Sequence, residues 1–215
     1  MATRSQSTLE PRKSPVQARS TASVEAILKA TLQVLVGIGK ERLTTTRVAA
    51  RAGVSVGTLY QYFPNKRALL RAALQRHLEE VSSAMENVCR EQRGSTLRQM
   101  AAALVTAFLE AKMKKARISA ALYSVSSDID GAAISREMSV RGHRAVAAML
   151  ATAQDPLATD PELVASMLLA VMAGLSRRLL ESATPEKDYP QLRDELIFLL
   201  QAYLEASTNR RLLLA

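Results

Sequence analysis

The sequence predicts an all-α fold, and three observations support this fold class. Apolar residues recur every three or four positions, which is the period of a helix with one buried face. All seven prolines fall between these periodic segments, where helices end. The two-residue alternation typical of a β-strand is absent from the sequence. The pattern predicts about nine helices, over residues 22–37, 45–51, 55–62, 65–91, 95–112, 116–125, 131–153, 161–182 and 189–207.

The composition is that of a folded protein whose charge is unevenly distributed. Of the 215 residues, 48% are hydrophobic and 23% are charged, which excludes disorder as the dominant state. Residues 1–67 carry 11 lysines and arginines against 3 acidic residues, whereas the remainder carries 18 against 17. A basic segment joined to a neutral body indicates that a small part meets a polyanion. Nucleic acid is the first candidate, and an anionic membrane surface is the second.

Other classes of protein lack support in the sequence. The longest apolar stretch, residues 163–175, is shorter than the roughly 20 residues that span a bilayer, and residues 1–20 lack the apolar core of a secretory signal. We therefore expect a cytoplasmic protein without a membrane partner. A lone cysteine, Cys89, and two distant histidines, His77 and His143, give no reason to expect a metal or another cofactor. Catalytic motifs are also missing, so we do not expect an enzyme.

Residues 43–70 carry the features of a helix-turn-helix in the correct order. The threonine run 44–46 is placed to cap a short helix through a hydroxyl group. Gly53 can adopt the positive φ of a sharp turn, and Ser55 can cap the helix that follows. These features predict two short helices that cross closely, which is the arrangement of a helix-turn-helix.

The second of these helices is the predicted DNA-reading element, because its N-terminal residues would enter the major groove. Leu59 and Phe63 are expected to face inward. Lys66, at the start of the next helix, is suited to a phosphate. Four residues are expected to face the groove and two tyrosines to offer hydroxyls at its margins: Val56, Gly57, Thr58 and Gln61, with Tyr60 and Tyr62.

The string AARAGVSVGTLYQYFPNKRALL resembles the helix-turn-helix and following helix of the tetracycline-repressor (TetR) family of bacterial transcriptional regulators. The resemblance covers about residues 20–75. It implies a homodimer in which each subunit has a three-helix DNA-binding domain and a larger helical domain that binds a small molecule and dimerises. We therefore expect a flexible basic arm over residues 1–19, a DNA-binding domain over 20–67 and a ligand-binding and dimerisation domain over 68–215.

The resemblance also implies which positions meet DNA. By motif position these are Thr45, Thr46, Val56, Gly57, Thr58, Tyr60, Gln61, Tyr62 and Lys66, and we add Ser55 and Arg47 to the predicted set. Thr46 stands where some family members place a base-reading arginine, and the neighbouring Arg47 is a possible substitute. In the arm, Arg12, Lys13 and Arg19 either follow the minor groove or belong to a solubilising tail.

The body offers a candidate dimer interface. From Leu163 to Leu175 the sequence is apolar on nearly every side, so the predicted helix 161–182 should be buried all round. One stripe contains Val164, Leu168, Val171, Leu175 and Leu179, and another contains Met167, Ala170 and Gly174. The last helix adds Leu192, Leu196, Leu199, Leu200 and Tyr203. Two such helices from each subunit would form a four-helix interface, and the alternative is a monomer with a thick core.

The body also carries seven methionines, whose flexible thioethers suit a pocket for a largely apolar effector. The alternative is that they belong to an ordinary core. In the family the pocket is surrounded by the helices that carry Phe108, Tyr123, Met138, His143 and Met149, so these five are our candidate ligand residues. His143 has a second interpretation, a solvated helix face.

Two functions remain to be compared. The first is a ligand-responsive dimeric repressor that binds a pseudo-palindromic operator and is released by a small molecule. The second is a sequence-tolerant DNA-packing protein. They differ in specificity, because a regulator should prefer its operator over random DNA by about 10³-fold or more.

Overall fold

The structure is a computed structural model that describes residues 18–209, and within that range it contains helices and no strands. The all-α prediction is confirmed. The elements are α1 (Ala18–Arg42), α2 (Thr45–Ala52), α3 (Val56–Tyr62), α4 (Lys66–Glu91), α5 (Leu97–Met113), α6 (Ala116–Val125), the 3₁₀ helix η1 (Ser126–Ile129), α7 (Gly131–Leu150), α8 (Pro161–Glu181) and α9 (Pro185–Thr208).

The chain divides into two compact units, and the first is built from two separate segments. It comprises the chain up to His77 together with Ala120–Ile134, whereas the second comprises Leu78–Ser119 and the chain from Ser135 onward. The chain therefore passes between the units within α4, α6 and α7. The domain boundary predicted at residue 67 left residues 120–134 in the body. The structure groups them with the first unit instead.

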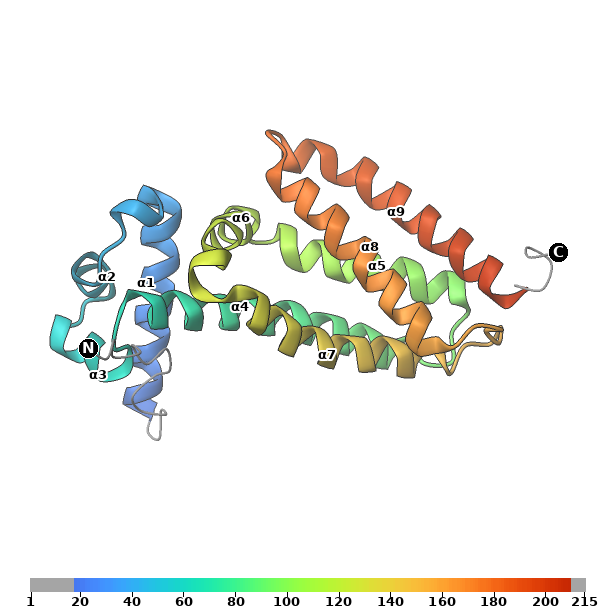
Figure 1. Ribbon diagram of the computed structural model, residues 1–215, viewed down its shortest axis with the longest axis horizontal. Coiled ribbons are helices and arrows are strands. Elements are labelled where there is room, and N and C mark those ends of the chain that lie inside the picture. Colours follow the sequence, from blue (N-terminus) through green and yellow to red (C-terminus); the bar gives the residue numbers. More distant parts are fainter. Residues whose placement is uncertain (1–17, 210–215) are drawn as a thin grey trace, which may run out of the picture. The chain divides into compact units, whose positions relative to one another are not determined.

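In the first unit α1 is longer than predicted, at both ends. It begins at Ala18, so Arg19 lies in a helix and not in the predicted arm. Ile27 and Leu35 are buried on one face, and the buried Thr31 donates a hydrogen bond from its hydroxyl to the carbonyl of Ile27 at 2.8 Å. Gly39 breaks the helical geometry with φ 77° and ψ 169°, a conformation that favours glycine. Figure 1 shows α2 and α3 beside α1.

The segment 120–134 joins the first unit through close packing against α4. A Cβ atom placed on Gly131 would lie 3.0 Å from Cδ2 of Leu74 and 2.2 Å from Oγ of Ser126. The glycine thus permits an approach that any side chain would block. Ile129 and Ile134 on either side are buried, so this segment contributes to the core of the first unit.

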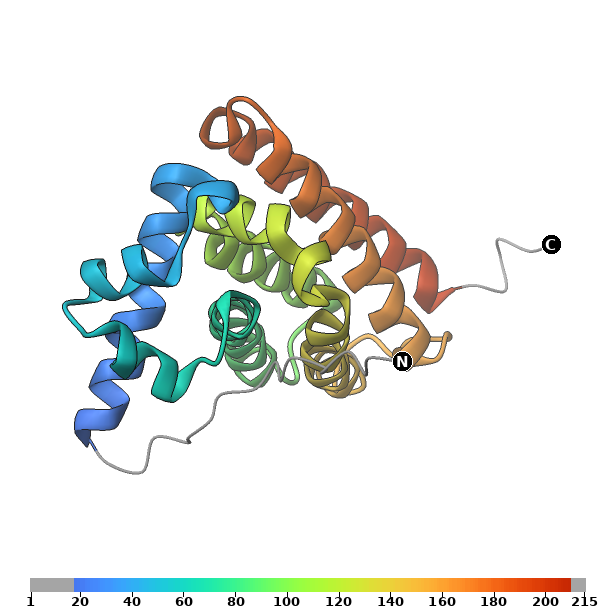
Figure 2. The same cartoon turned by 60° about the vertical axis from the view of Figure 1, so that its left-hand side comes forward.

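The second unit is a helical bundle centred on α5, which packs against α9 and α8. Its core includes Leu104, Leu109, Leu168, Leu200 and Leu204, all of them buried. Helices α8 and α9 lie side by side in Figure 1, and Figure 2 shows the same pairing from a second direction.

The two predicted stripes of α8 differ in burial, although Val171 and Leu175 of the first stripe are only partly buried. Val164, Leu168 and Leu179 are buried inside the unit, whereas Met167, Ala170 and Gly174 are exposed. On α9, Leu196 and Leu200 are buried and Leu199 is exposed, so only part of the predicted interface set points outward.

Helix α9 begins four residues earlier than predicted. Pro185 occupies its first turn, where the missing N–H costs nothing, and Pro190 lies inside the helix. The predicted start at residue 189 left Pro185 outside the helix and placed Pro190 at its beginning, whereas in the structure Pro185 begins the helix and Pro190 lies further in. The first turns of a helix tolerate proline better than its interior, since their N–H groups have few intrahelical partners.

Two helices are long and apolar enough by composition to cross a membrane, over Ser20–Arg42 and Pro161–Glu181. Our sequence criterion missed them because it counted unbroken apolar residues, whereas their mean hydropathy values are 1.4 and 1.6. Each packs one face within its own unit, which is also the behaviour of core helices in soluble proteins. This composition is therefore weak support for a membrane role.

Candidate nucleic-acid interface

Side-chain caps fix both short helices of the helix-turn-helix. The Thr44 hydroxyl accepts a hydrogen bond from the Arg47 backbone N–H at 3.3 Å at the start of α2. Gly53 ends α2 in the left-handed conformation with φ 69°, which glycine adopts without strain. The Ser55 hydroxyl then accepts from the Thr58 N–H at 2.9 Å and starts α3. Because neither helix could persist alone in water, these caps and the packing on α1 hold them in place.

Helix α3 has one buried face and one exposed face. Leu59 and Phe63 are buried, as predicted from their spacing. Gly57, Tyr60 and Gln61 are exposed, and Val56 and Thr58 are partly exposed. The N-terminal half of α3 therefore presents backbone and small side chains to the outside, which a groove floor can approach closely.

Tyr62 departs from the prediction. We expected its hydroxyl at the margin of the groove, but the side chain is only 9% exposed and belongs to the core of the first unit. Its hydroxyl donates a hydrogen bond to Oγ of Ser20 at 3.1 Å, so it fastens α3 to the start of α1. The phenol ring is large enough to fill the core while its hydroxyl still reaches a partner.

Four further members of the predicted DNA-contact set have intramolecular partners. The Tyr60 hydroxyl lies 3.1 Å from Oγ1 of Thr45, which joins α3 to α2. Arg47 donates from Nη1 to the carbonyl of Arg42 at 2.7 Å. Lys66 donates from Nζ to the carbonyl of Lys40 at 2.6 Å, where the end of α1 leaves a carbonyl without a helical partner. Lys66 therefore caps α1 in this structure while it remains half-buried, and its contact with a phosphate stays a prediction.

The exposed surface of the first unit keeps a positive charge. Arg42, Arg47, Arg51 and Arg67 are exposed, and Arg51 is held by Gln33, whose Oε1 accepts from Nε at 2.7 Å. Thr46 and Ser55 complete the exposed part of the predicted set. Arg12 and Lys13 lie outside the described residues. The pairing of Arg51 with Gln33, eighteen residues away, had no local signal in the sequence.

The five candidate ligand residues differ in burial and are divided between the two units. Phe108 and Met149 are buried in the main core cluster of the second unit, and Met138 is buried in the same unit outside that cluster. Tyr123 belongs to the first unit and is 42% exposed. His143 joins α7 to α8, because its Nε2 lies 2.9 Å from the carbonyl of Glu162 and 2.8 Å from Oγ of Ser166. None of the five lines the cavity described next.

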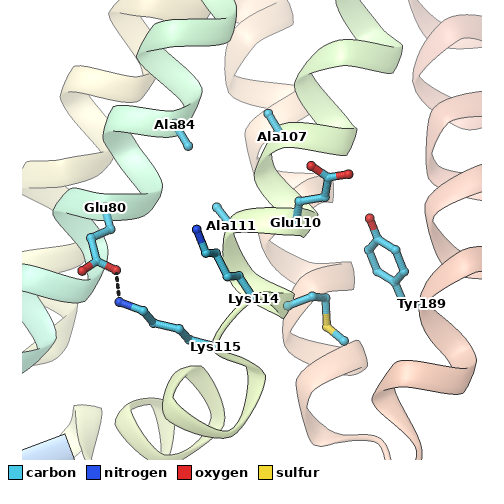
Figure 3. A pocket seen from close by; sticks show the side chains of 9 residues that line it. Glu80, Ala84, Ala107, Glu110, Ala111, Lys114, Lys115 and Tyr189 are labelled. Atoms are coloured by element: carbon cyan, nitrogen blue, oxygen red, sulfur yellow. Dashed lines mark hydrogen bonds and ion pairs between the residues drawn. The ribbon is translucent and has the colours of Figure 1, made fainter.

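A cavity of ≈ 810 Å³ lies within the second unit, and we call it the α5 cavity. Helices α4, α5 and α9 supply its walls (Figure 3). Its lining residues are Glu80, Ala84, Ala107, Glu110, Ala111, Met113, Lys114, Lys115 and Tyr189. The sequence gives little sign of this site because small residues form much of it. The alanines at 107 and 111 share one face of α5, and that spacing is the signal that could have found it.

The fold and the capped helix-turn-helix define a helical DNA-binding regulator with a separate body. The comparisons with known proteins agree. Residues 27–73 match the family described as bacterial regulatory proteins, tetR family, and residues 96–204 match the tetracyclin repressor-like C-terminal domain. The chain belongs to the TetR family of bacterial regulators.

Individual relatives are similar over shorter stretches. The nucleoid occlusion factor SlmA of Haemophilus ducreyi is 35% identical over 89 residues, which cover 39% of this chain and 44% of that protein. The transcriptional repressor KstR of Rhodococcus jostii is 48% identical over 61 residues, which cover 28% and 29%. The matched region thus spans less than half the length of these curated relatives.

Among solved structures, the TetR-like regulator LfrR of Mycobacterium smegmatis in complex with proflavine has the same fold. Its TM-score is 0.58 at 21% sequence identity, over 86% of this chain and 96% of that one.

Proposed function

We propose that this chain is a homodimeric transcriptional repressor that binds a pseudo-palindromic DNA operator and releases it when a small molecule binds the helical body. The observation that carries the proposal is the exposed N-terminal face of α3, capped by Ser55 and backed by the buried Leu59 and Phe63. The family membership and the basic surface of the first unit support it. The protein would act in the cytoplasm and carry out no catalysis.

In the proposed complex α3 enters the major groove. Gly57 allows the helix to approach the base edges, and Gln61 is placed to pair with an adenine edge. Val56 and the Thr58 methyl group would contact thymine methyl groups. The hydrogen bond between Tyr60 and Thr45 would hold the tyrosine ring at the margin of the groove and fix its hydroxyl near a phosphate.

The proposed dimer uses the outer faces of α8 and α9. Four large apolar side chains are exposed there: Leu163 at 48%, Met167 at 47%, Phe198 at 69% and Leu199 at 48%. Ala170 and Gly174 on the same face of α8 would admit a close neighbour. Two copies related by a twofold axis would bury these faces in a four-helix arrangement. The dimer would then present two α3 helices to successive major grooves, about 34 Å apart.

The proposed effector binds in the body. The α5 cavity supports this part of the proposal, since its volume lies in the range of sites for drug-sized ligands. The solved structure of LfrR with proflavine supports it as well, because that regulator has the same fold and holds a small organic molecule.

The test is fluorescence anisotropy of the full-length protein with labelled DNA from upstream of its own gene, across a salt series and with scrambled competitor DNA. We expect Gln61→Ala to weaken operator binding by roughly 5- to 100-fold, the cost of one base contact. Gln92→Ala, in the turn that follows α4 in the second unit, is the matched control and should bind normally. Equal binding to operator and scrambled DNA with a steep salt slope would instead support the DNA-packing function.

A further inference from the structure

The α5 cavity is lined by equal numbers of positive and negative charges, but the two signs are unevenly placed around it. Two lysines, Lys114 and Lys115, face two glutamates, Glu80 and Glu110. Lys115 donates from Nζ to Oε2 of Glu80 at 2.7 Å, and this ion pair between the α5–α6 turn and α4 neutralises both groups. Lys114 and Glu110 are the charges that remain.

Lys114 caps the C-terminus of α5 four residues after Glu110, the spacing at which a glutamate and a following lysine commonly pair. Among the described residues neither forms an ion pair, and both are exposed. In Figure 3 the two side chains extend to opposite sides of α5. Lys114 extends toward α4, where the Glu80–Lys115 pair lies, and Glu110 extends toward α9. The cavity therefore has a cationic side and an anionic side.

A second polar group lies on the anionic side. The hydroxyl of Tyr189 on α9 is buried, and no described group meets it within hydrogen-bond distance. The guanidinium of Arg193 lies 5.8 Å from the centre of the tyrosine ring, and Asp194 neutralises this arginine. A buried hydroxyl without a partner destabilises a folded protein. A ligand group that meets this hydroxyl after a small rotation of the ring would remove that cost. Together with the Glu110 carboxylate, the hydroxyl can accept hydrogen bonds from an N–H donor.

Between the two sides the walls are apolar and nearly flat. Ala84 on α4 and Ala107, Ala111 and Met113 on α5 line this part of the cavity. Alanine side chains project little, and methionine adapts its shape to what it meets. This surface suits the rigid ring body of an organic molecule.

We propose that the α5 cavity takes a zwitterionic, ring-containing organic molecule whose acidic group lies at Lys114 and whose N–H donor lies at Glu110 and the Tyr189 hydroxyl. This inference rests on the proposed function, because the molecule would be the effector that releases DNA. It adds the charge class of the ligand, which neither the family nor the fold specifies.

Three xanthene dyes of the same ring body test the charge class at pH 8. Rhodamine 110 is a zwitterion, rhodamine 123 is its cationic methyl ester, and fluorescein is an anion. We expect the full-length protein to bind rhodamine 110 about fivefold tighter than either of the other two, measured by dye anisotropy, since one exposed ion pair contributes up to that factor. Equal affinity for the three dyes, tighter binding of either charged dye, or no binding would overturn the inference.

Two charge-neutralising variants locate the two ends of the ligand. Lys114→Gln should weaken rhodamine 110 about fivefold and leave rhodamine 123 unweakened, whereas Glu110→Gln should weaken both rhodamines and leave fluorescein unweakened. The matched controls are Arg144→Gln and Glu91→Gln, exposed charges of the second unit outside the cavity lining. Control variants with the same effects, or cavity variants with none, contradict the proposal.

A cavity-filling variant tests the location, and DNA binding separates this inference from the proposed function. Ala111→Trp should abolish rhodamine 110 binding, and retained binding would mean that the dye binds elsewhere. Operator binding without dye tests the repressor independently. If the dyes follow the expected pattern but rhodamine 110 leaves operator affinity unchanged, the charge class holds and the release mechanism fails. If operator binding is normal and no dye binds, the inference fails and the DNA-binding function stands.

Discussion

The ammonium group of Lys40 lies 2.9 Å from Oδ2 of Asp128, and this contact joins the end of α1 to the 3₁₀ helix η1. The two residues are 88 positions apart in the sequence. The same α1 terminus receives the Lys66 ammonium on the carbonyl of Lys40. Changes in the position of η1 would therefore be transmitted to the helix against which α2 packs.

This ion pair predicts a pH-dependent contribution to stability. The hydrogen bond and charge of Lys40 lower the pKa of Asp128, and the same partner raises the pKa of Lys40. The contribution should be present above about pH 4, the unfolded pKa of aspartate, and disappear as the pH falls through the lower folded value. At the alkaline end it should persist to about pH 10.4 and disappear as the pH rises through the raised pKa of Lys40.

Thermal unfolding of Asp128→Asn against the unchanged protein across this range measures the effect. The difference in melting temperature should be confined to that window and shrink in roughly 1 M salt, because both side chains are exposed to solvent. The control is Asp155→Asn, an exposed loop acid. A difference that persists at pH 2 would show that the pair is not its source.

Two glycines of α1 should respond to the same substitution in opposite directions. Gly37 is helical and open space surrounds it, so Gly37→Ala should raise the free energy of unfolding by about 0.4–1 kcal/mol. Gly39 adopts φ 77° and ψ 169°, so Gly39→Ala should lower it by about 1–3 kcal/mol. Chemical denaturation of both variants checks this. Equal changes would mean that the backbone break at Gly39 is absent in solution.

The two neighbouring tyrosines of α3 should separate stability from DNA binding. Tyr62→Phe removes the hydrogen bond to Ser20 and should cost about 0.5–1.5 kcal/mol of stability, with little effect on operator affinity. Tyr60→Phe removes an exposed hydroxyl and should weaken operator binding while leaving stability nearly unchanged. Denaturation curves and operator anisotropy of the two variants decide this. Loss of DNA binding only in Tyr62→Phe would mean that the Tyr62 hydroxyl contacts DNA after all.

A charge on the outer face of α8 or α9 should break the dimer. Met167→Glu and Phe198→Glu should each weaken self-association by about 30-fold or more, the effect of losing one central contact of an interface. Val140→Glu introduces the same charge at a side chain of α7 that is 50% exposed and serves as the control. Sedimentation velocity over a concentration series gives the result. Unchanged association in both variants would place the interface elsewhere.

The single cysteine should be unreactive in the folded protein. Burial raises the pKa of the Cys89 thiol to about 12, with a smaller contribution from Glu86. The thiolate fraction at pH 8 is then about three orders of magnitude below that of a free cysteine. Iodoacetamide should leave the native protein unmodified and label the denatured protein, as mass spectrometry would show. Rapid labelling of the native protein would mean that α4 opens around this residue.

The period of the apolar residues and the residues that cap or end helices predicted most of the fold. The site depended on contacts between distant residues, which no local pattern contains. The spacing of Leu59 and Phe63 determined the inward face of α3, and Ser55 marked its start. The burial of Tyr62 and the capping contact of Lys66 had no local signal, because the partners of these side chains lie 42 and 26 positions away. The α5 cavity was not predicted because alanines line it, and the sequence patterns that we used identify large apolar residues.

The two-segment first unit has a consequence for protein engineering. A chimaera that transfers the helix-turn-helix to another ligand-binding body, cut within α4, would carry the capped helices but leave behind residues 120–134. Those residues supply the buried Ile129 and the glycine that packs on Leu74. A functional graft therefore has to take this internal segment along, or select a recipient whose own segment fits the α4 surface. The helix-turn-helix of this protein therefore cannot be transferred as one continuous segment.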